Sequence, residues 1–331
     1  MKRALCWLAA LCMIAAFIAG CGQVSVPKSS QAEDEHTTWP QVVSTTFPGY
    51  DFARAVLGNS DNITMLLPPG AESHSFEPTP RDILHIQNCD VFIYGGGESD
   101  VWVDSILASM DTSIMTIIAM MDVVEVVPEE LVEGMETDHE HEEEHEIGDA
   151  HKDEEREYDE HVWTSPVNAI KIVEAIADAL SAVDIQHMDL YRANTETYVA
   201  RLEAIDASFR DVVAKSERTT LIFSERFPFR YFVDEYGLDY YAAFPGCSTE
   251  TEASAQTVAF LIDKTRDENI PVVFFTEFSN EKMADTLGEA TGAKKLLFHS
   301  CHNITRDELW QGITYIQLME ANVEALREAL H

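Results

Sequence analysis

Short apolar runs alternate with amphipathic stretches along most of this chain. The apolar runs are rich in β-branched and aromatic residues, and the stretches between them have helical spacing. Strands that alternate with helices in this way are typical of parallel sheets covered by helices. The pattern predicts strands at residues 41–47, 63–67, 89–94 and 114–119 in the first half, and at 221–223, 240–243, 272–276 and 295–298 in the second.

Between the two halves the pattern is helical throughout, from about residue 165 to 216. Apolar residues recur there at three- and four-residue intervals, which marks one buried face on each of two successive helices. We therefore predict an α/β fold with two parallel-sheet lobes, residues 41–186 and 218–331, joined by a long rigid helix at 187–217. A cleft between two such lobes is a natural place for a ligand.

The alternation is interrupted between about residues 128 and 160. This stretch consists mainly of Glu, Asp and His, so it has almost nothing to bury and is predicted to be a disordered insertion in the first lobe. Imidazoles and carboxylates at high density bind transition metals without fixed geometry. The insertion is therefore either an accessory metal-collecting loop or a solvated acidic loop, and its histidines are His139, His141, His145 and His151.

One string in the insertion, from His141 to His145, matches the H-E-x-x-H pattern of zinc proteases. That chemistry requires a helix with a buried face, which holds two imidazoles on zinc while the Glu activates water. No apolar residue supports such a helix here, and no motif outside the insertion indicates an enzyme. We therefore predict that the protein is not an enzyme.

The first residues indicate export. Lys2 and Arg3 precede an apolar run that is short for a transmembrane helix and ends in small residues. Residues 1–20 are therefore interpreted as a signal peptide, and Cys21 resembles the lipidated cysteine of bacterial lipoproteins. Residues 21–40 are polar and lack periodicity, as in a flexible tether. These features predict a protein anchored by lipid to the extracytoplasmic face of the bacterial cell membrane.

The net charge of the chain limits the kinds of molecule that it can bind. The formal net charge is −37 and the sequence pI is about 4.4. Nucleic acid is excluded as a partner, because its phosphates would be repelled. This balance fits a soluble surface protein or one that concentrates cations.

Three cysteines remain once the signal peptide and Cys21 are set aside: Cys89, Cys247 and Cys301. A Cys247–Cys301 disulfide is compatible with an oxidising compartment. Three cysteines allow three pairings, however, and the sequence does not choose among them.

Two histidines stand in segments suited to a cleft. His74 lies between the strand predicted at 63–67 and a helical stretch, in a loop framed by Gly70 and Pro80. His161 lies where the regular pattern returns after the insertion. Residue type alone leaves open whether either histidine is a ligand or an ordinary polar residue.

Several motifs follow one another in order along the chain. They are Val42–Pro48, His74-x-x-Glu77-Pro78-x-Pro80, Gly95–Glu98 followed by Trp102, His161-x-Trp163-x-x-Pro166, Phe229–Phe232 with Tyr236–Leu238, and Thr276-Glu277. In combination they make the chain similar to the metal-binding receptor lipoproteins of zinc and manganese ABC importers, across almost the whole mature region. The resemblance implies two lobes, a metal ion held in the cleft by four side chains, and delivery of that ion to a permease with its ATPase.

The first three ligands follow from the family motifs with unequal clarity. The first two are histidines, which correspond to His74 and His161. The third, a His in zinc members or a Glu in manganese members, falls on Arg226, which stays protonated and cannot bind a cation. Glu225 takes its place if the loop holds one extra residue. A surface ion pair with Arg226 or Arg230 is the alternative role for Glu225.

The family's fourth ligand is an Asp after the last strand of the second lobe. The corresponding loop here, Phe298–Asn303, contains no Asp. His302 is our interpretation, with His299 and Cys301 as alternatives. Glu277 closes another strand of this lobe and is expected to orient a His ligand.

Three imidazoles and one carboxylate favour Zn²⁺ over Mn²⁺. The His-rich insertion is typical of the zinc branch, whereas Glu225 resembles the manganese branch. We predict a monomeric Zn²⁺-binding receptor of an ABC importer. A Mn²⁺ receptor or a metal-binding surface adhesin with the same fold is the alternative.

Overall fold

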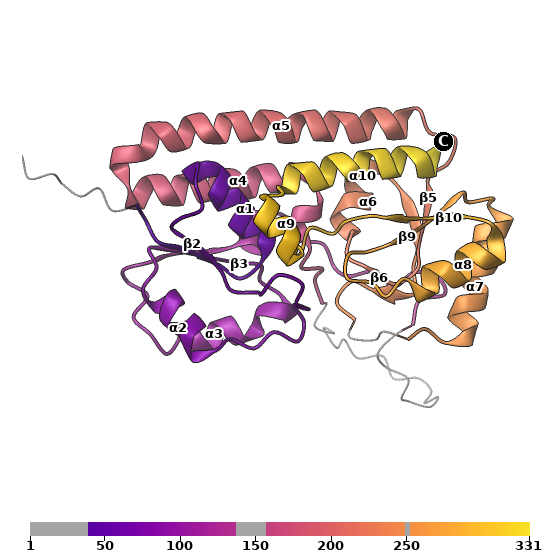
Figure 1. Ribbon diagram of the computed structural model, residues 1–331, viewed down its shortest axis with the longest axis horizontal. Helices are drawn as coiled ribbons and strands as arrows, with labels where there is room; N and C mark the ends of the chain where they lie inside the picture. The colour runs from indigo at the N-terminus through magenta and orange to yellow at the C-terminus, as the bar shows by residue number, and fades with distance from the viewer. Residues whose placement is uncertain (1–38, 137–156, 249–251) are drawn as a thin grey trace, which may run out of the picture. The chain divides into compact units, whose positions relative to one another are not determined.

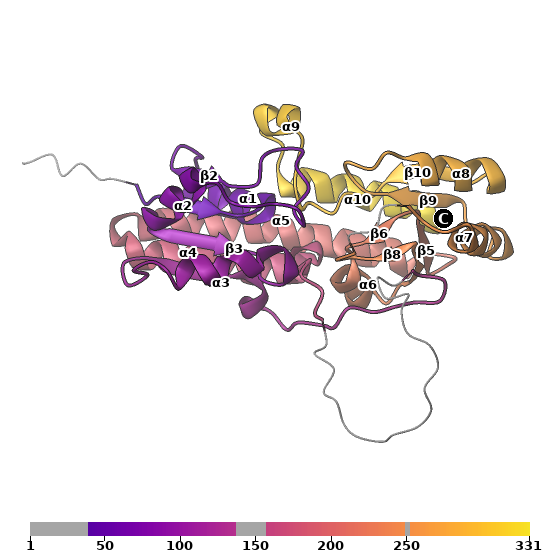
Figure 2. The same cartoon turned by 90° about the horizontal axis from the view of Figure 1, so that it is seen from below.

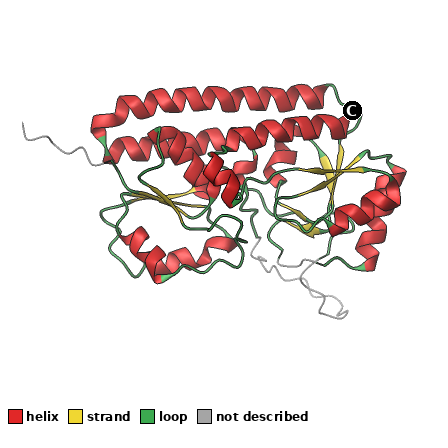
Figure 3. Cartoon of the chain, in the orientation of Figure 1, coloured by secondary structure: helices red, strands yellow, loops and turns green. Residues whose placement is uncertain are grey.

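The computed structural model describes residues 39–136, 157–248 and 252–331. Within these residues the strands form two four-stranded parallel sheets and one two-stranded parallel sheet (Figures 1 and 3). No helix in these ranges is long and apolar enough to cross a membrane.

The first sheet has the order β2-β1-β3-β4. Its two faces bury alternate side chains of each strand, as a pleated strand requires. Val42 and Ile93 face a core that includes α1 and α4, whereas Val43 and Phe92 face a second core with α2 and α3. The elements are β1 (Val42–Ser44), α1 (Phe47–Leu57), β2 (Ile63–Met65), α2 (Pro80–Gln87), β3 (Val91–Tyr94), α3 (Val101–Leu107), β4 (Thr116–Ala119) and α4 (Pro166–Val183).

The second sheet repeats this arrangement in the order β10-β9-β5-β7. Phe223 and Phe274 face α6 and α10, and Ile222 and Val273 face α7 and α8. The elements are β5 (Thr220–Phe223), β6 (Arg226–Phe227), α6 (Arg230–Tyr236), β7 (Asp239–Tyr241), β8 (Phe244–Pro245), α7 (Ala255–Asp267), β9 (Val272–Phe275), α8 (Lys282–Thr291), β10 (Lys294–Leu297), α9 (Arg306–Gln311) and α10 (Tyr315–Leu330).

One long helix, α5 (Met188–Ala214), runs along both lobes, as Figures 1 and 2 show. It packs against α1 and α4 of the first lobe and α10 of the second. Its buried side chains, among them Tyr191, Leu202 and Phe209, belong to a single apolar cluster that includes residues of both sheets. The predicted α/β fold, with two parallel-sheet lobes and a long connecting helix, is confirmed.

Ordered structure reaches further into the acidic insertion than its composition predicted. Pro128 forms an antiparallel bridge with Tyr158, and the Glu136 amide donates to the carbonyl of Ala243 in the second lobe. Carboxylates make this possible, because Glu129 accepts a hydrogen bond from the Cys247 amide at 2.9 Å. The acidic side chains at the start of the insertion are therefore bound to the second lobe rather than simply solvated.

Candidate metal centre

The parallel sheets bring the candidate residues together. In parallel strands the loops after the carboxyl ends meet at one edge, where ligands usually bind. His74 lies in the loop after β2, and His302 in the loop after β10. His161 immediately precedes η3 (Val162–Thr164), which leads into α4.

Short 3₁₀ segments also occur at η1 (Glu98–Asp100), η2 (Met120–Val123) and η4 (Ile185–His187).

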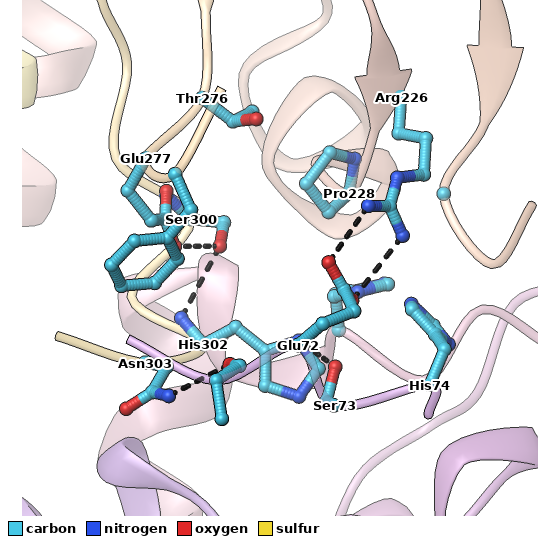
Figure 4. A pocket seen from close by; sticks show the side chains of 14 residues that line it. Glu72, Ser73, His74, Arg226, Pro228, Thr276, Glu277, Ser300, His302 and Asn303 are labelled. Atoms are coloured by element: carbon cyan, nitrogen blue, oxygen red, sulfur yellow. Dashed lines mark hydrogen bonds and ion pairs between the residues drawn. The ribbon is translucent and has the colours of Figure 1, made fainter. Parts of the chain in front are cut away.

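Three imidazoles converge on one cavity of about 60 Å³. The ring centroids of His161 and His302 are 5.3 Å apart, and that of His74 is 6.3 Å from His161 and 6.2 Å from His302. The ligand atoms of His74 and His161 lie within 4.8 Å of each other, which suits nitrogen atoms that bind one ion at about 2.0–2.1 Å, and the ring of His302 lies beside both rings. The lining residues, many of them labelled in Figure 4, are Ala71, Glu72, Ser73, His74, His161, Arg226, Pro228, Gly246, Thr276, Glu277, Phe278, Ser300, His302 and Asn303.

His74 and His161 each have a partner on Nδ1. The Nδ1 of His161 lies 3.1 Å from a carboxylate oxygen of Asp159, and that of His74 lies 2.9 Å from Ser99 Oγ. Burial lowers the pKa of His74 to about 4, with the positive charges of His161 and Arg226 adding to the effect. Burial also opposes protonation of His161, but the carboxylates of Asp159 and Glu160 outweigh it and raise its pKa.

His302 belongs to the second lobe by sequence but is bound to the first. Its carbonyl accepts a hydrogen bond from the Phe47 amide at 3.3 Å, and the Asn303 side chain donates to the carbonyls of Pro68 and Ala71. Its ring packs edge-on against Trp163, and burial lowers its pKa, as do the nearby His161 and His74. All three imidazoles are therefore held by first-lobe contacts.

The structure does not bring Glu225 to the three imidazoles. Its carboxylate accepts a hydrogen bond from Ser279 Oγ at 2.6 Å, and it does not line the cavity. Arg226 lines the cavity instead, and its guanidinium binds both carboxylate oxygens of Glu72, at 2.9 and 3.3 Å (Figure 4). The one-residue shift that the sequence interpretation required is therefore absent, because β6 places Arg226 at the wall of the cavity.

The alternatives to His302 are buried elsewhere in its loop. His299 does not line the cavity; its Nδ1 accepts a hydrogen bond from the Cys301 amide. Cys301 is fully buried in the apolar cluster, and burial raises the pKa of its thiol well above the usual range. Glu277 accepts hydrogen bonds from the amide and hydroxyl of Ser300, so it holds the loop that carries His302.

The structure does not contain the Cys247–Cys301 disulfide that the sequence left as a possibility. Cys89, Cys247 and Cys301 are free thiols. Cys301 points into the apolar cluster, whereas the Cys247 amide binds Glu129 of the insertion. The two cysteines therefore face different neighbours, a separation that their sequence positions could not reveal.

Two buried carboxylates near the imidazoles were missed as site residues. Asp159 and Glu160 are 1% and 2% exposed, and ligand atoms of His74, Glu160 and His161 lie within 4.8 Å of one another. The sequence interpretation counted both acids as the end of the low-complexity insertion. Their position directly before His161 was the available signal, because acids often orient metal-binding histidines.

Several predicted features lie outside the described residues. These are the signal peptide, Cys21 with most of the tether, and the insertion histidines His139, His141, His145 and His151. Their roles stay predictions.

The sequence and fold match characterised proteins. Residues 42–329 match the family described as ZnuA, zinc-uptake complex component A, periplasmic. The chain is 30% identical over 313 residues to the high-affinity zinc uptake system protein ZnuA of Bacillus subtilis, covering 95% of this chain and 93% of that protein. It is 31% identical over 329 residues to the zinc-binding lipoprotein AdcA of Streptococcus pneumoniae, covering 99% of this chain and 61% of AdcA.

Solved structures agree with the sequence matches. The Zn(II)-bound ZnuA-like domain of Streptococcus pneumoniae AdcA superposes with a TM-score of 0.71 at 27% identity, covering 88% of this chain and 99% of that domain. The metal-dependent lipoprotein YcdH of Bacillus subtilis gives 0.72 at 28% identity, covering 88% of this chain and all of that one. The family match covers nearly the whole described chain. The protein therefore belongs to the ZnuA family, which is described as component A, periplasmic, of zinc-uptake complexes.

Proposed function

We propose that this protein is an extracytoplasmic receptor that captures Zn²⁺ with His74, His161 and His302 and delivers it to an ABC importer. The observation that carries the proposal is the convergence of three imidazoles on one small cavity between the lobes. Its family consists of transport receptors rather than enzymes, and relatives are named as zinc-uptake and zinc-binding proteins.

The donor set favours zinc. Imidazole nitrogen suits Zn²⁺, whereas Mn²⁺ prefers carboxylate and water oxygen. Glu225 was the feature that resembled the manganese branch, and it does not line the cavity. The two carboxylates that line it are already engaged, Glu72 by Arg226 and Glu277 by Ser300. Glu160, whose ligand atom lies within 4.8 Å of those of His74 and His161, is engaged by Ser99. Nitrogen ligands therefore dominate the site.

Anchoring would assist delivery. A lipid on Cys21 and a flexible tether over residues 21–40 would hold a monomeric receptor at the membrane. An anchored receptor meets a permease in the same membrane at a raised effective concentration. The permease and its ATPase would then open the site and accept the ion.

Zinc content and competitive titration of the purified protein test the proposal. A deletion of residues 139–154 removes all four insertion histidines but spares Asp159 and Glu160, which contact the site. We expect one tightly bound Zn²⁺ per chain in the wild type and in the deletion variant, and loss of tight binding in His74→Ala. Loss of tight zinc on deletion, with His74→Ala unaffected, would place the ion in the insertion and refute the cavity as the receptor site.

A further inference from the structure

Ser99 joins a buried carboxylate to the ring of His74. Its hydroxyl donates to Glu160 Oε1, and its amide donates to Glu160 Oε2 at 2.9 Å. The same hydroxyl oxygen lies 2.9 Å from His74 Nδ1. Glu160 is 2% exposed, so the carboxylate end of this chain of contacts is shielded from water.

The direction of these hydrogen bonds determines where the His74 proton lies. A serine hydroxyl has one proton to donate. Because that proton goes to the Glu160 carboxylate, the oxygen can only accept from His74, and the donor must be Nδ1–H. The carboxylate is 3.9 Å from Nδ1, so its negative charge also favours a proton on that nitrogen. The other ring nitrogen, Nε2, is then left with the lone pair that a metal ion needs.

The backbone conformation around Ser99 brings its amide and hydroxyl close to Glu160. Asp100 accepts hydrogen bonds from the amides of Gly95 and Gly96, at 2.7 and 3.2 Å, which fixes the loop after β3. Gly97 has a φ of +83°, and a Cβ there would lie 2.8 Å from the Glu160 Cβ. Only glycine therefore allows the loop to approach Glu160 closely enough for Ser99 to bind it.

We propose that Ser99 and Glu160 are positioning residues that hold His74 in its Nδ1–H tautomer, so that Nε2 is available to the ion. This proposal depends on the proposed function in one respect only, because it takes the ion that binds in the cavity to be Zn²⁺. A neutral imidazole carries its single proton on one of its two nitrogens, so the tautomer decides which nitrogen can bind an ion. Partners of this kind typically change metal affinity about 10- to 100-fold.

Long-range ¹H–¹⁵N NMR spectra of the metal-free, ¹⁵N-histidine-labelled protein provide the test, because the two tautomers have distinct nitrogen shifts. His74→Gln assigns the signal by removing it. We expect the Nδ1–H tautomer in the wild type and in Ser99→Thr, which keeps the hydroxyl. In Ser99→Ala and Glu160→Gln the signal should move toward the Nε2–H tautomer, and zinc affinity should fall about 10- to 100-fold. Glu157→Gln is the matched control, an exposed carboxylate three residues before Glu160, and should change neither readout.

An Nε2–H tautomer in the wild type, or an unchanged tautomer in Ser99→Ala, would overturn the proposal. The Ser99→Ala and Ser99→Thr pair decides the matter even if Glu160→Gln fails to fold. Because the tautomer is measured without metal, it is independent of the proposed function. A wild type that bound no zinc would refute that function while the spectrum still decided the role of Ser99.

Discussion

His302 is the ligand candidate that depends most on its immediate neighbours. It lines the cavity, whereas Cys301 next to it is fully buried in the apolar cluster. We expect His302→Ala to weaken zinc binding by about 100-fold or more, because a structural zinc site draws some 10–16 kcal/mol from its ligands together. Cys301→Ala should leave the affinity within about threefold, since Cys301 lies in the apolar cluster and does not line the cavity. Competitive titration with a chromogenic chelator measures both.

The opposite result would identify a different ligand. Loss of zinc in Cys301→Ala, with His302→Ala unaffected, would make the thiolate the ligand. Each variant should also be tested for stability by urea unfolding, so that a general loss of folding is separated from the loss of a donor.

The histidines of the site could be predicted from sequence, but their supporting residues could not. His74 and His161 stand in motifs with a recognisable order, and His302 stands in a loop with two other candidates. Residue chemistry favours Glu225 over Arg226, because a guanidinium cannot bind a cation. A guanidinium indeed cannot be a metal ligand, but this fact does not determine which of the two residues lines the cavity. Glu72, which pairs with Arg226, lies 154 positions away in sequence, so no local pattern could connect them.

At the scale of elements, the Glu72–Arg226 pair ties the loop after β2 to β6 across the cavity. The loop after β2 also carries His74, so the pair should help to keep the cavity closed. We expect Glu72→Gln and Arg226→Gln each to speed zinc dissociation by up to about fivefold, since pairs of this exposure contribute about 0.2–1 kcal/mol. The double variant should be no faster than either single variant, because each change breaks the same contact.

Stopped-flow transfer of zinc to an excess of chelator measures these rates. Arg201→Gln is the matched control, because Arg201 pairs with Glu320 at 3.3 Å between α5 and α10, and neither residue lines the metal cavity. Equal rates in all variants would show that the Glu72–Arg226 pair does not control release.

The corner between α4 and α5 is held by Asp184. Asp184 accepts hydrogen bonds from the Tyr191 hydroxyl and His187 Nδ1, both at 2.7 Å. Burial opposes its ionisation, but these two donors outweigh burial and lower its pKa. A lowered pKa in the folded state adds stability above the unfolded value of about 3.9, which is lost as pH falls through the folded pKa.

Asp184→Asn should therefore lower the free energy of unfolding by about 2 kcal/mol at pH 7. The difference from wild type should shrink as pH falls below about 4, where the unfolded carboxylate takes up a proton, and should vanish only below the lower pKa of the folded carboxylate. Urea unfolding at pH 7 and pH 3.5 measures it, with Asp189→Asn at the same corner as control, since that side chain is 91% exposed. A penalty that does not change with pH would mean that charge is not the cause.

The strands and long helices were predictable because apolar periodicity is a local signal. The small elements were not predictable in this way. The six residues of α9 contain a single strongly apolar pair, Leu309 and Trp310, which is too short a stretch to show a period. The pairing of β6 with β8 involves two residues from each strand, and its position at the cavity is what places Arg226 there.

At the scale of the whole molecule, both lobes share one apolar core. The cluster that contains Val42 and Phe52 of the first lobe also contains Phe223 and Phe274 of the second, through the buried face of α5. Opening one lobe would therefore expose apolar surface of the other. We expect the metal-free protein to unfold in a single thermal transition, although its sheets are separate.

Zinc should then stabilise the molecule as a unit. An ion that binds only the folded state adds about 2.7 kcal/mol when its free concentration is 100 times Kd. For a chain of this size, that corresponds to a rise in Tm of roughly 4–5 °C, which calorimetry with buffered zinc would measure. His74→Ala should unfold near the metal-free temperature and show no rise at the same zinc concentration. Two separate transitions would contradict a shared core, and an equal rise in His74→Ala would mean that the stabilising ion sits outside the cavity.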